Sequence, residues 1–82
     1  MGKTILVVDD QSSVRQLLHD YLTEQGYRII EAGDGEAALY TVRRDTPDVI
    51  LLDIMMSKMD GYQFLRLLRQ ERQIPVIIIT AR

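Results

Sequence analysis

Residues 5–10 read Ile-Leu-Val-Val-Asp-Asp, and residues 49–53 read Val-Ile-Leu-Leu-Asp. Each stretch is a short apolar run that contains β-branched residues and stops at an aspartate. A run of this kind, without alternating polar residues, is typical of a strand that is buried on both faces of a parallel sheet. The two stretches therefore predict a parallel sheet with carboxylates at the ends of its strands.

The segment after the first strand has the pattern of an amphipathic helix. Its apolar residues recur at the spacing that places them on one helical face. We expect Ser12 or Ser13 to cap this helix, because a hydroxyl can accept a hydrogen bond from a first-turn N–H. Gly26 stands where a helix C-terminus favours a left-handed residue. The apolar stripe of this helix consists of Val14, Leu17, Leu18, Tyr21 and Leu22.

The rest of the chain repeats the alternation of strand and helix. A strand is expected at residues 28–32, followed by a helix that Asp34 caps, and a last strand is expected at residues 76–79. The order β-α-β-α-β-α-β predicts an α/β fold with helices on both faces of the sheet. The third helix, before the last strand, is expected to turn three leucines inward: Leu65, Leu67 and Leu68.

The composition excludes several classes of protein. The 82 residues contain no cysteine, which excludes a disulfide scaffold, a zinc knuckle and a thiol nucleophile. The net charge is −2 without a basic run, so direct binding of nucleic acid is not expected. No apolar run is long enough to cross a membrane and no signal peptide is evident. We expect a cytoplasmic domain.

Four polar side chains are expected where the buried strands end. They are Asp9 and Asp10 after the first strand, Asp53 after the third and Thr80 after the fourth. If the first and third strands are neighbours, the three carboxylates crowd together and repel one another. Mg²⁺ would remove this conflict, because it prefers oxygen ligands and is commonly held by one or two carboxylates. An aspartate beside Mg²⁺ can attack phosphorus and form an acyl phosphate.

Several separated motifs carry a resemblance to a known family. They are Val-Val-Asp-Asp at 7–10, Asp-Gly-Glu-Ala at 34–37, Pro-Asp-Val-Ile-Leu-Leu-Asp at 47–53, Met-Asp-Gly at 59–61 and Pro-Val-Ile-Ile-Ile-Thr-Ala at 75–81. Together they resemble the receiver domain of a two-component response regulator, and the resemblance covers the whole chain. It implies a flavodoxin-like, doubly wound parallel sheet in which the strand order begins 2-1-3-4.

The resemblance also implies roles for individual residues. Asp53 would be the phospho-acceptor of a sensor histidine kinase, in a signalling module and not an enzyme. Asp9, Asp10, Asp53 and the backbone carbonyl of Met55 would hold Mg²⁺. Thr80 would be the switch hydroxyl that follows the phosphoryl group.

The length departs from the family pattern. Receiver domains continue with a fourth helix, a fifth strand and a fifth helix, so residues 1–82 are expected to form the N-terminal two-thirds of one domain. The fifth strand carries the lysine that contacts the phosphoryl group, and we therefore expect phosphorylation to be impaired. The bare edge from Val76 to Thr80 suggests a homodimer. The alternative is an inactive truncated or engineered fragment that self-associates as a structural scaffold.

Two other functions fit the residues less well. A flavin or nucleotide binder needs a loop after the first strand that cradles phosphate with backbone N–H groups, and Asp9-Asp10 presents negative charge there. An aspartate-nucleophile phosphatase would carry a second acid two residues after the nucleophile, where this chain has Met55.

Overall fold

The computed structural model of the chain describes residues 2–56 and 60–79. Strands and helices alternate along the chain, as the apolar patterns predict. The elements are β1 (Thr4–Val8), α1 (Ser12–Glu24), β2 (Arg28–Ala32), α2 (Gly35–Asp45), β3 (Val49–Asp53), α3 (Gly61–Glu71) and β4 (Val76–Ile79).

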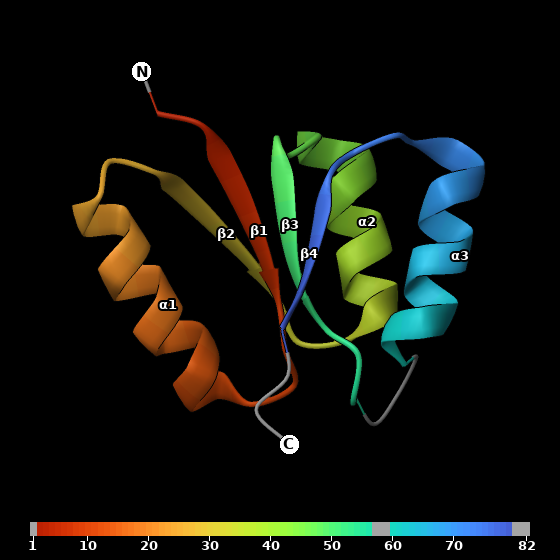
Figure 1. The fold of residues 1–82 in the computed structure, drawn as a ribbon, viewed down its shortest axis with the longest axis horizontal. Helices are drawn as coiled ribbons and strands as arrows, with labels where there is room; N and C mark the ends of the chain where they lie inside the picture. The colour runs from red at the N-terminus through yellow and green to blue at the C-terminus, as the bar shows by residue number, and fades with distance from the viewer. Residues whose placement is uncertain (1, 57–59, 80–82) are drawn as a thin grey trace.

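The four strands form one parallel sheet in the order β2-β1-β3-β4. This is the order that the resemblance implies for a flavodoxin-like receiver domain. The helix α1 covers one face of the sheet, and α2 and α3 cover the other (Figure 1). Val8 of β1 pairs with Leu52 of β3, and Asp53 pairs with Ile79 of β4. The carboxyl ends of the strands therefore lie along one edge of the sheet, at the lower side of the view.

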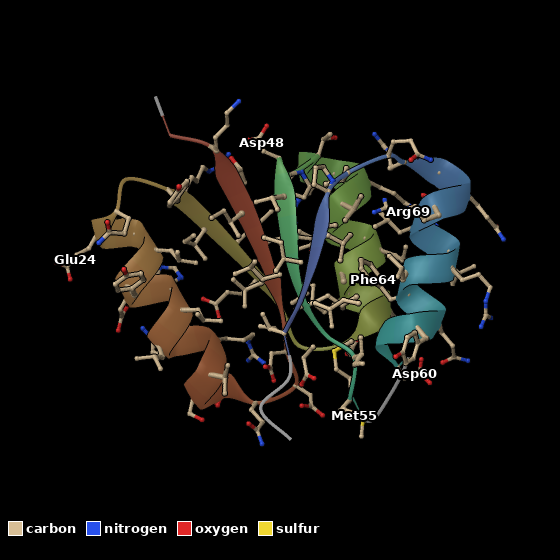
Figure 2. The ribbon with its side chains drawn as sticks, viewed as in Figure 1. Glu24, Asp48, Met55, Asp60, Phe64 and Arg69 are labelled. Atoms are coloured by element: carbon tan, nitrogen blue, oxygen red, sulfur yellow. The ribbon has the colours of Figure 1, made fainter. Side chains whose placement is uncertain are left out.

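The hydrophobic core lies mainly between the sheet and the pair of helices α2 and α3. Strands β1 and β3 supply its centre, and Phe64 and Leu68 of α3 are fully buried against it (Figure 2). The inward-facing set predicted for α3 is partly wrong, because Leu67 is 36% exposed and Phe64 takes the inner face. At 3.6 residues per turn, Leu67 lies about a quarter turn or more from the centre of the face that Phe64, Leu65 and Leu68 share.

The predicted cap of α1 is also wrong. Gln11 occupies the N-cap position without a capping side chain, and Ser12 and Ser13 lie inside the first turn. The reason lies in the preceding loop, where Asp9 Oδ1 accepts a hydrogen bond of 2.9 Å from the Gln11 N–H. This contact turns the chain at Gln11, before either serine. Both serines therefore lie inside the helix, past the position at which a side chain caps it.

The signals at Asp34 and Gly26 act as predicted, and a further cap stands at the start of α3. The Asp34 side chain caps α2 by accepting a hydrogen bond of 2.8 Å from Ala37 N–H. Gly26 follows α1 with a φ of +97°, a conformation that costs a residue with a Cβ extra energy. Asp60 and Gln63 form a capping box at the start of α3, which fixes where that helix leaves the carboxyl edge of the sheet.

Apolar side chains remain exposed on α1 and on β4. No residue of α1 is buried, and Leu17 and Tyr21 are 69% and 60% exposed. Ile77 and Ile78 of the edge strand β4 are about half exposed. Within the described residues, no helix combines the length and the apolar character that a membrane crossing requires.

Candidate functional site

Three carboxylates converge at the carboxyl edge of the sheet. Asp9 and Asp10 follow β1, and Asp53 ends the neighbouring strand β3. One carboxylate oxygen from each residue lies within 4.8 Å of the others. Asp9 and Asp53 are 4% and 2% exposed, whereas Asp10 is half-buried at the rim. The parallel pairing of β1 with β3 therefore creates the carboxylate cluster that the strand ends predict.

The chain orients two of these carboxylates in the same way. Asp9 Oδ1 accepts a hydrogen bond from Gln11 N–H, and Asp53 Oδ1 accepts one from Met55 N–H; both bonds are 2.9 Å long. An aspartate that binds the N–H two residues later forms a turn that ends a strand and fixes its own side chain. The same local chemistry thus terminates β1 and β3 and directs both acids into the site.

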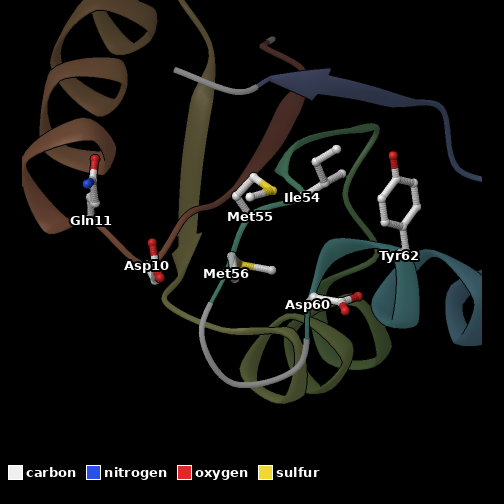
Figure 3. A pocket seen from close by; sticks show the side chains of 7 residues that line it. All are labelled: Asp10, Gln11, Ile54, Met55, Met56, Asp60 and Tyr62. Carbon is white, nitrogen blue, oxygen red and sulfur yellow. The ribbon is translucent and has the colours of Figure 1, made fainter. Parts of the chain in front are cut away.

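An open pocket of about 650 Å³ adjoins the cluster. In Figure 3, Asp10 and Gln11 stand on one side, Asp60 and Tyr62 stand on the other, and two methionines lie between them. Met55 is 56% exposed, whereas Met56 is buried and packs in the core. The full lining is Asp10, Gln11, Ile54, Met55, Met56, Asp60 and Tyr62.

Sequence reasoning missed the wall that α3 contributes to the pocket. Gly61 N–H donates to the Ile54 carbonyl at 3.2 Å, and this contact draws the start of α3 onto the loop that follows Asp53. Tyr62 reaches the pocket for that reason. The Asp60-Gly61 pair was the available signal in the sequence. It marks the start of α3, so Tyr62, the next residue, lies near the carboxyl ends of the strands.

The donor set suits a hard divalent cation. All three side chains offer carboxylate oxygens, which are the ligands that Mg²⁺ prefers. Crowded negative charge in a partly buried site is unfavourable unless a cation offsets it. The residues present therefore fit the cation that the sequence predicts.

The remaining predicted site residues have different outcomes. Met55 lies at the pocket, with its N–H bound to Asp53. Thr80 lies outside the described residues, directly after Ile79, the partner of Asp53 in the sheet. Its proposed role as switch hydroxyl stays a prediction.

A family model described as the response regulator receiver domain matches residues 5–82. The chain belongs to this family. Among curated relatives, ycf27 of Pyropia yezoensis is 47% identical over 77 residues, which are 94% of this chain and 32% of the relative. PhoP of Bacillus subtilis, an alkaline phosphatase synthesis transcriptional regulatory protein, is 43% identical over 83 residues, covering 100% of this chain and 35% of the relative. This chain thus spans about a third of the length of these relatives.

Solved receiver domains have the same fold. The N-terminal domain of a response regulator receiver protein from Methanoculleus marisnigri is 41% identical, with a TM-score of 0.94 over 98% of this chain and 68% of that one. The response regulator TrrA from Thermotoga maritima, in complex with Mg²⁺ and BeF, is 37% identical, with a TM-score of 0.92 over 98% of this chain and 70% of that one. The flavodoxin-like fold and the receiver family are therefore confirmed.

The family places this chain in two-component signalling. Receiver domains are signalling modules that sensor histidine kinases phosphorylate, and their acidic site binds Mg²⁺. This receiver domain carries an acidic cluster at the corresponding edge of its sheet.

Proposed function

We propose that this receiver domain accepts a phosphoryl group on Asp53 from a sensor histidine kinase. The observation that carries the proposal is the convergence of Asp9, Asp10 and Asp53, with one oxygen of each within 4.8 Å of the others. Asp53 is the last residue of β3, is almost fully buried and is oriented by Met55 N–H. Asp9 shares the burial and the orientation, so the choice of Asp53 as the acceptor rests on its match to the receiver-domain motif at residues 47–53. A carboxylate fixed in this way is suited to attack along one direction.

In this reaction the phosphoryl group passes from the donor to a carboxylate oxygen of Asp53. A carboxylate oxygen of Asp53 attacks phosphorus, and the bond from phosphorus to the donor's leaving group breaks, with its electron pair going to that group. With a phosphohistidine donor the leaving group is the imidazole nitrogen. The product is an acyl phosphate on Asp53, and Met55 N–H keeps the carboxyl group in place throughout.

Asp9, Asp10 and Asp53, with the backbone carbonyl of Met55, are proposed to hold Mg²⁺. When bound, the cation would offset the charge of the carboxylates and of the incoming phosphoryl group. The support is the all-oxygen donor set and the open pocket, which leaves room for phosphoryl oxygens and water beside Asp10.

Mass spectrometry after incubation with acetyl phosphate and Mg²⁺ tests the proposal. We expect the mass of one phosphoryl group on the peptide that contains Asp53, and its loss in Asp53→Asn. Asp10→Asn should reduce the labelling strongly. Asp60→Asn is the matched control, because it lines the same pocket outside the cluster and asparagine remains a good helix cap. A label that persists in Asp53→Asn would overturn the assignment.

Labelling of the 82-residue chain is expected to stay below one phosphoryl group per chain. Among the residues that the structure describes, Lys3 is the sole lysine, and it precedes β1 at the end of the sheet opposite Asp53. A lysine that could neutralise a phosphoryl group on Asp53 is thus not supplied by this part of the chain. Complete labelling under the same conditions would contradict the expectation of impaired transfer.

We also propose that two copies associate through β4. Within the described part of the chain, β4 pairs with β3 on one side only, and its Ile77 and Ile78 are about half exposed. A second β4 strand could pair with this edge and cover both isoleucines. Light scattering should give a mass above that of one chain at high concentration, and Ile78→Lys should lower it. A wild-type chain that remains monomeric at every concentration would overturn this proposal.

A further inference from the structure

Arg15, in the first turn of α1, reaches back over the loop that carries two of the site carboxylates. Its Nη1 donates to the backbone carbonyl of Asp9 at 2.5 Å, and its Nε donates to Oε1 of Glu31 at 3.3 Å. The Asp9 carbonyl belongs to the peptide group that joins Asp9 to Asp10. The guanidinium therefore holds the peptide plane from which both carboxylates project.

Glu31 anchors the guanidinium from the neighbouring strand β2. It pairs in register with Val7 of β1, one residue before the end of that strand. Its second carboxylate oxygen lies 2.8 Å from Nδ1 of His19, one helical turn after Arg15. The side chains of Arg15 and Glu31 are 21% and 32% exposed, so water screens this pair less than it screens a fully exposed ion pair.

The chain at Gly33 passes beside the guanidinium. A Cβ at this position would lie 3.4 Å from Nη1 of Arg15, at the limit of tight contact. The planar group is thus held by the Asp9 carbonyl and the Glu31 carboxylate, with the start of the β2–α2 loop beside it. A side chain held in this way restrains the atom to which it donates.

We propose that Arg15 is a positioning residue of the cation site. By holding the peptide between Asp9 and Asp10, it directs their carboxylates towards Asp53, and its charge offsets part of their mutual repulsion. This inference rests on the proposed binding of Mg²⁺ by these acids. Partners that orient metal ligands typically change metal affinity by about 10–100-fold when they are removed.

The test compares Mg²⁺ affinity among variants of the 82-residue chain. A ligand that binds the folded state raises the thermal midpoint by an amount set by its concentration and Kd, so the midpoint at several Mg²⁺ concentrations gives Kd. For Arg15→Ala we expect Kd to rise about tenfold or more. Arg15→Lys should show a smaller rise in Kd, because lysine keeps a charged donor but cannot bind the Asp9 carbonyl and the Glu31 carboxylate at once in the geometry of a guanidinium. Glu31→Gln should also raise Kd. Arg66→Ala, which removes an exposed arginine from α3, is the control and should leave Kd unchanged.

The outcomes separate this inference from the proposed function. If Asp10→Asn abolishes the Mg²⁺ response while Arg15→Ala leaves Kd unchanged, the role of Arg15 is overturned and the cation site stands. A merely structural Arg15 would lower the midpoint without Mg²⁺ and leave Kd as it is. A wild-type midpoint that does not respond to Mg²⁺ overturns the cation site and the role of Arg15 together. If Arg15→Ala does not fold, Arg15→Lys and Glu31→Gln decide by the same criterion.

Discussion

Replacing Gly61 with alanine should destabilise the receiver domain, although the same change at an unobstructed helix position adds stability. A Cβ at position 61 would lie 2.3 Å from Cα and 2.9 Å from Cβ of Ile54. The nearest of these atoms is main chain, so a side-chain rotation cannot relieve the clash. The start of α3 must move away from the loop, which stretches the hydrogen bond of 3.2 Å from Gly61 N–H to the Ile54 carbonyl.

The expected loss follows from three contributions. Overpacking costs about 1–3 kcal/mol, loss of the hydrogen bond adds about 0.5–1.5 kcal/mol, and reduced freedom of the unfolded chain returns about 0.4–1 kcal/mol. The net decrease in the free energy of unfolding is about 0.5–4 kcal/mol. A domain of this length has about 4–12 kcal/mol in total, so the change is readily measured.

Urea unfolding followed by far-UV circular dichroism measures this change. Gly26→Ala is the matched control, since a Cβ at this position meets no atom within 4 Å. Its only expected cost is the strain of a φ of +97° in a residue with a side chain, about 1 kcal/mol. We also expect Gly61→Ala to weaken Mg²⁺ binding, because Ile54 directly follows Asp53. A Gly61→Ala domain as stable as the wild type, or more stable, would refute the steric argument.

Three further predictions concern stability and use the same urea titration. Asp34→Ala should cost about 1 kcal/mol because it removes the side-chain cap of α2, whereas Asp34→Ser should retain most of the stability. Phe64→Ala should lower the free energy of unfolding by about 3–5 kcal/mol, because removal of this fully buried ring leaves a cavity. Leu67→Ala, on the exposed side of α3, should lower it far less. Equal losses in the two variants would contradict the observed orientation of α3. The hydrogen bond from Arg43 lowers the pKa of Glu71 below its usual value of 4.5. The stability contributed by this pair is therefore present above that value and is lost as the pH falls towards the lowered pKa. Glu71→Gln should show a weaker decline of stability in acid, and an unchanged acid profile would contradict the link.

The strand ends made the candidate site predictable from sequence. Apolar runs that stop at Asp9 and at Asp53 define two buried strands, and neighbouring parallel strands bring their carboxyl ends to one edge. The local signals at Asp34 and Gly26 were equally readable, because each depends on a few adjacent residues. These features need no knowledge of which distant segments touch.

The α3 helix was less predictable from its sequence. Leu65, Leu67 and Leu68 stand close together, so several faces of the helix look apolar, and the packing of Phe64 against the sheet decides between them. The predicted cap of α1 was wrong for a related reason, because the Asp9 carboxylate accepts from Gln11 N–H and the N-cap position falls at Gln11, one residue before Ser12.

The sequence by itself determined the α/β class, the strand order through family resemblance, and the gathering of three aspartates at one edge. Only the tertiary structure decided how those aspartates are held. Arg15 and Glu31 are sixteen residues apart in the sequence. They meet because α1 packs against the sheet where β1 pairs with β2. Hydrophobic patterning follows from local periodicity, which a sequence displays, whereas a polar contact between distant residues depends on distances that exist only after the chain has folded.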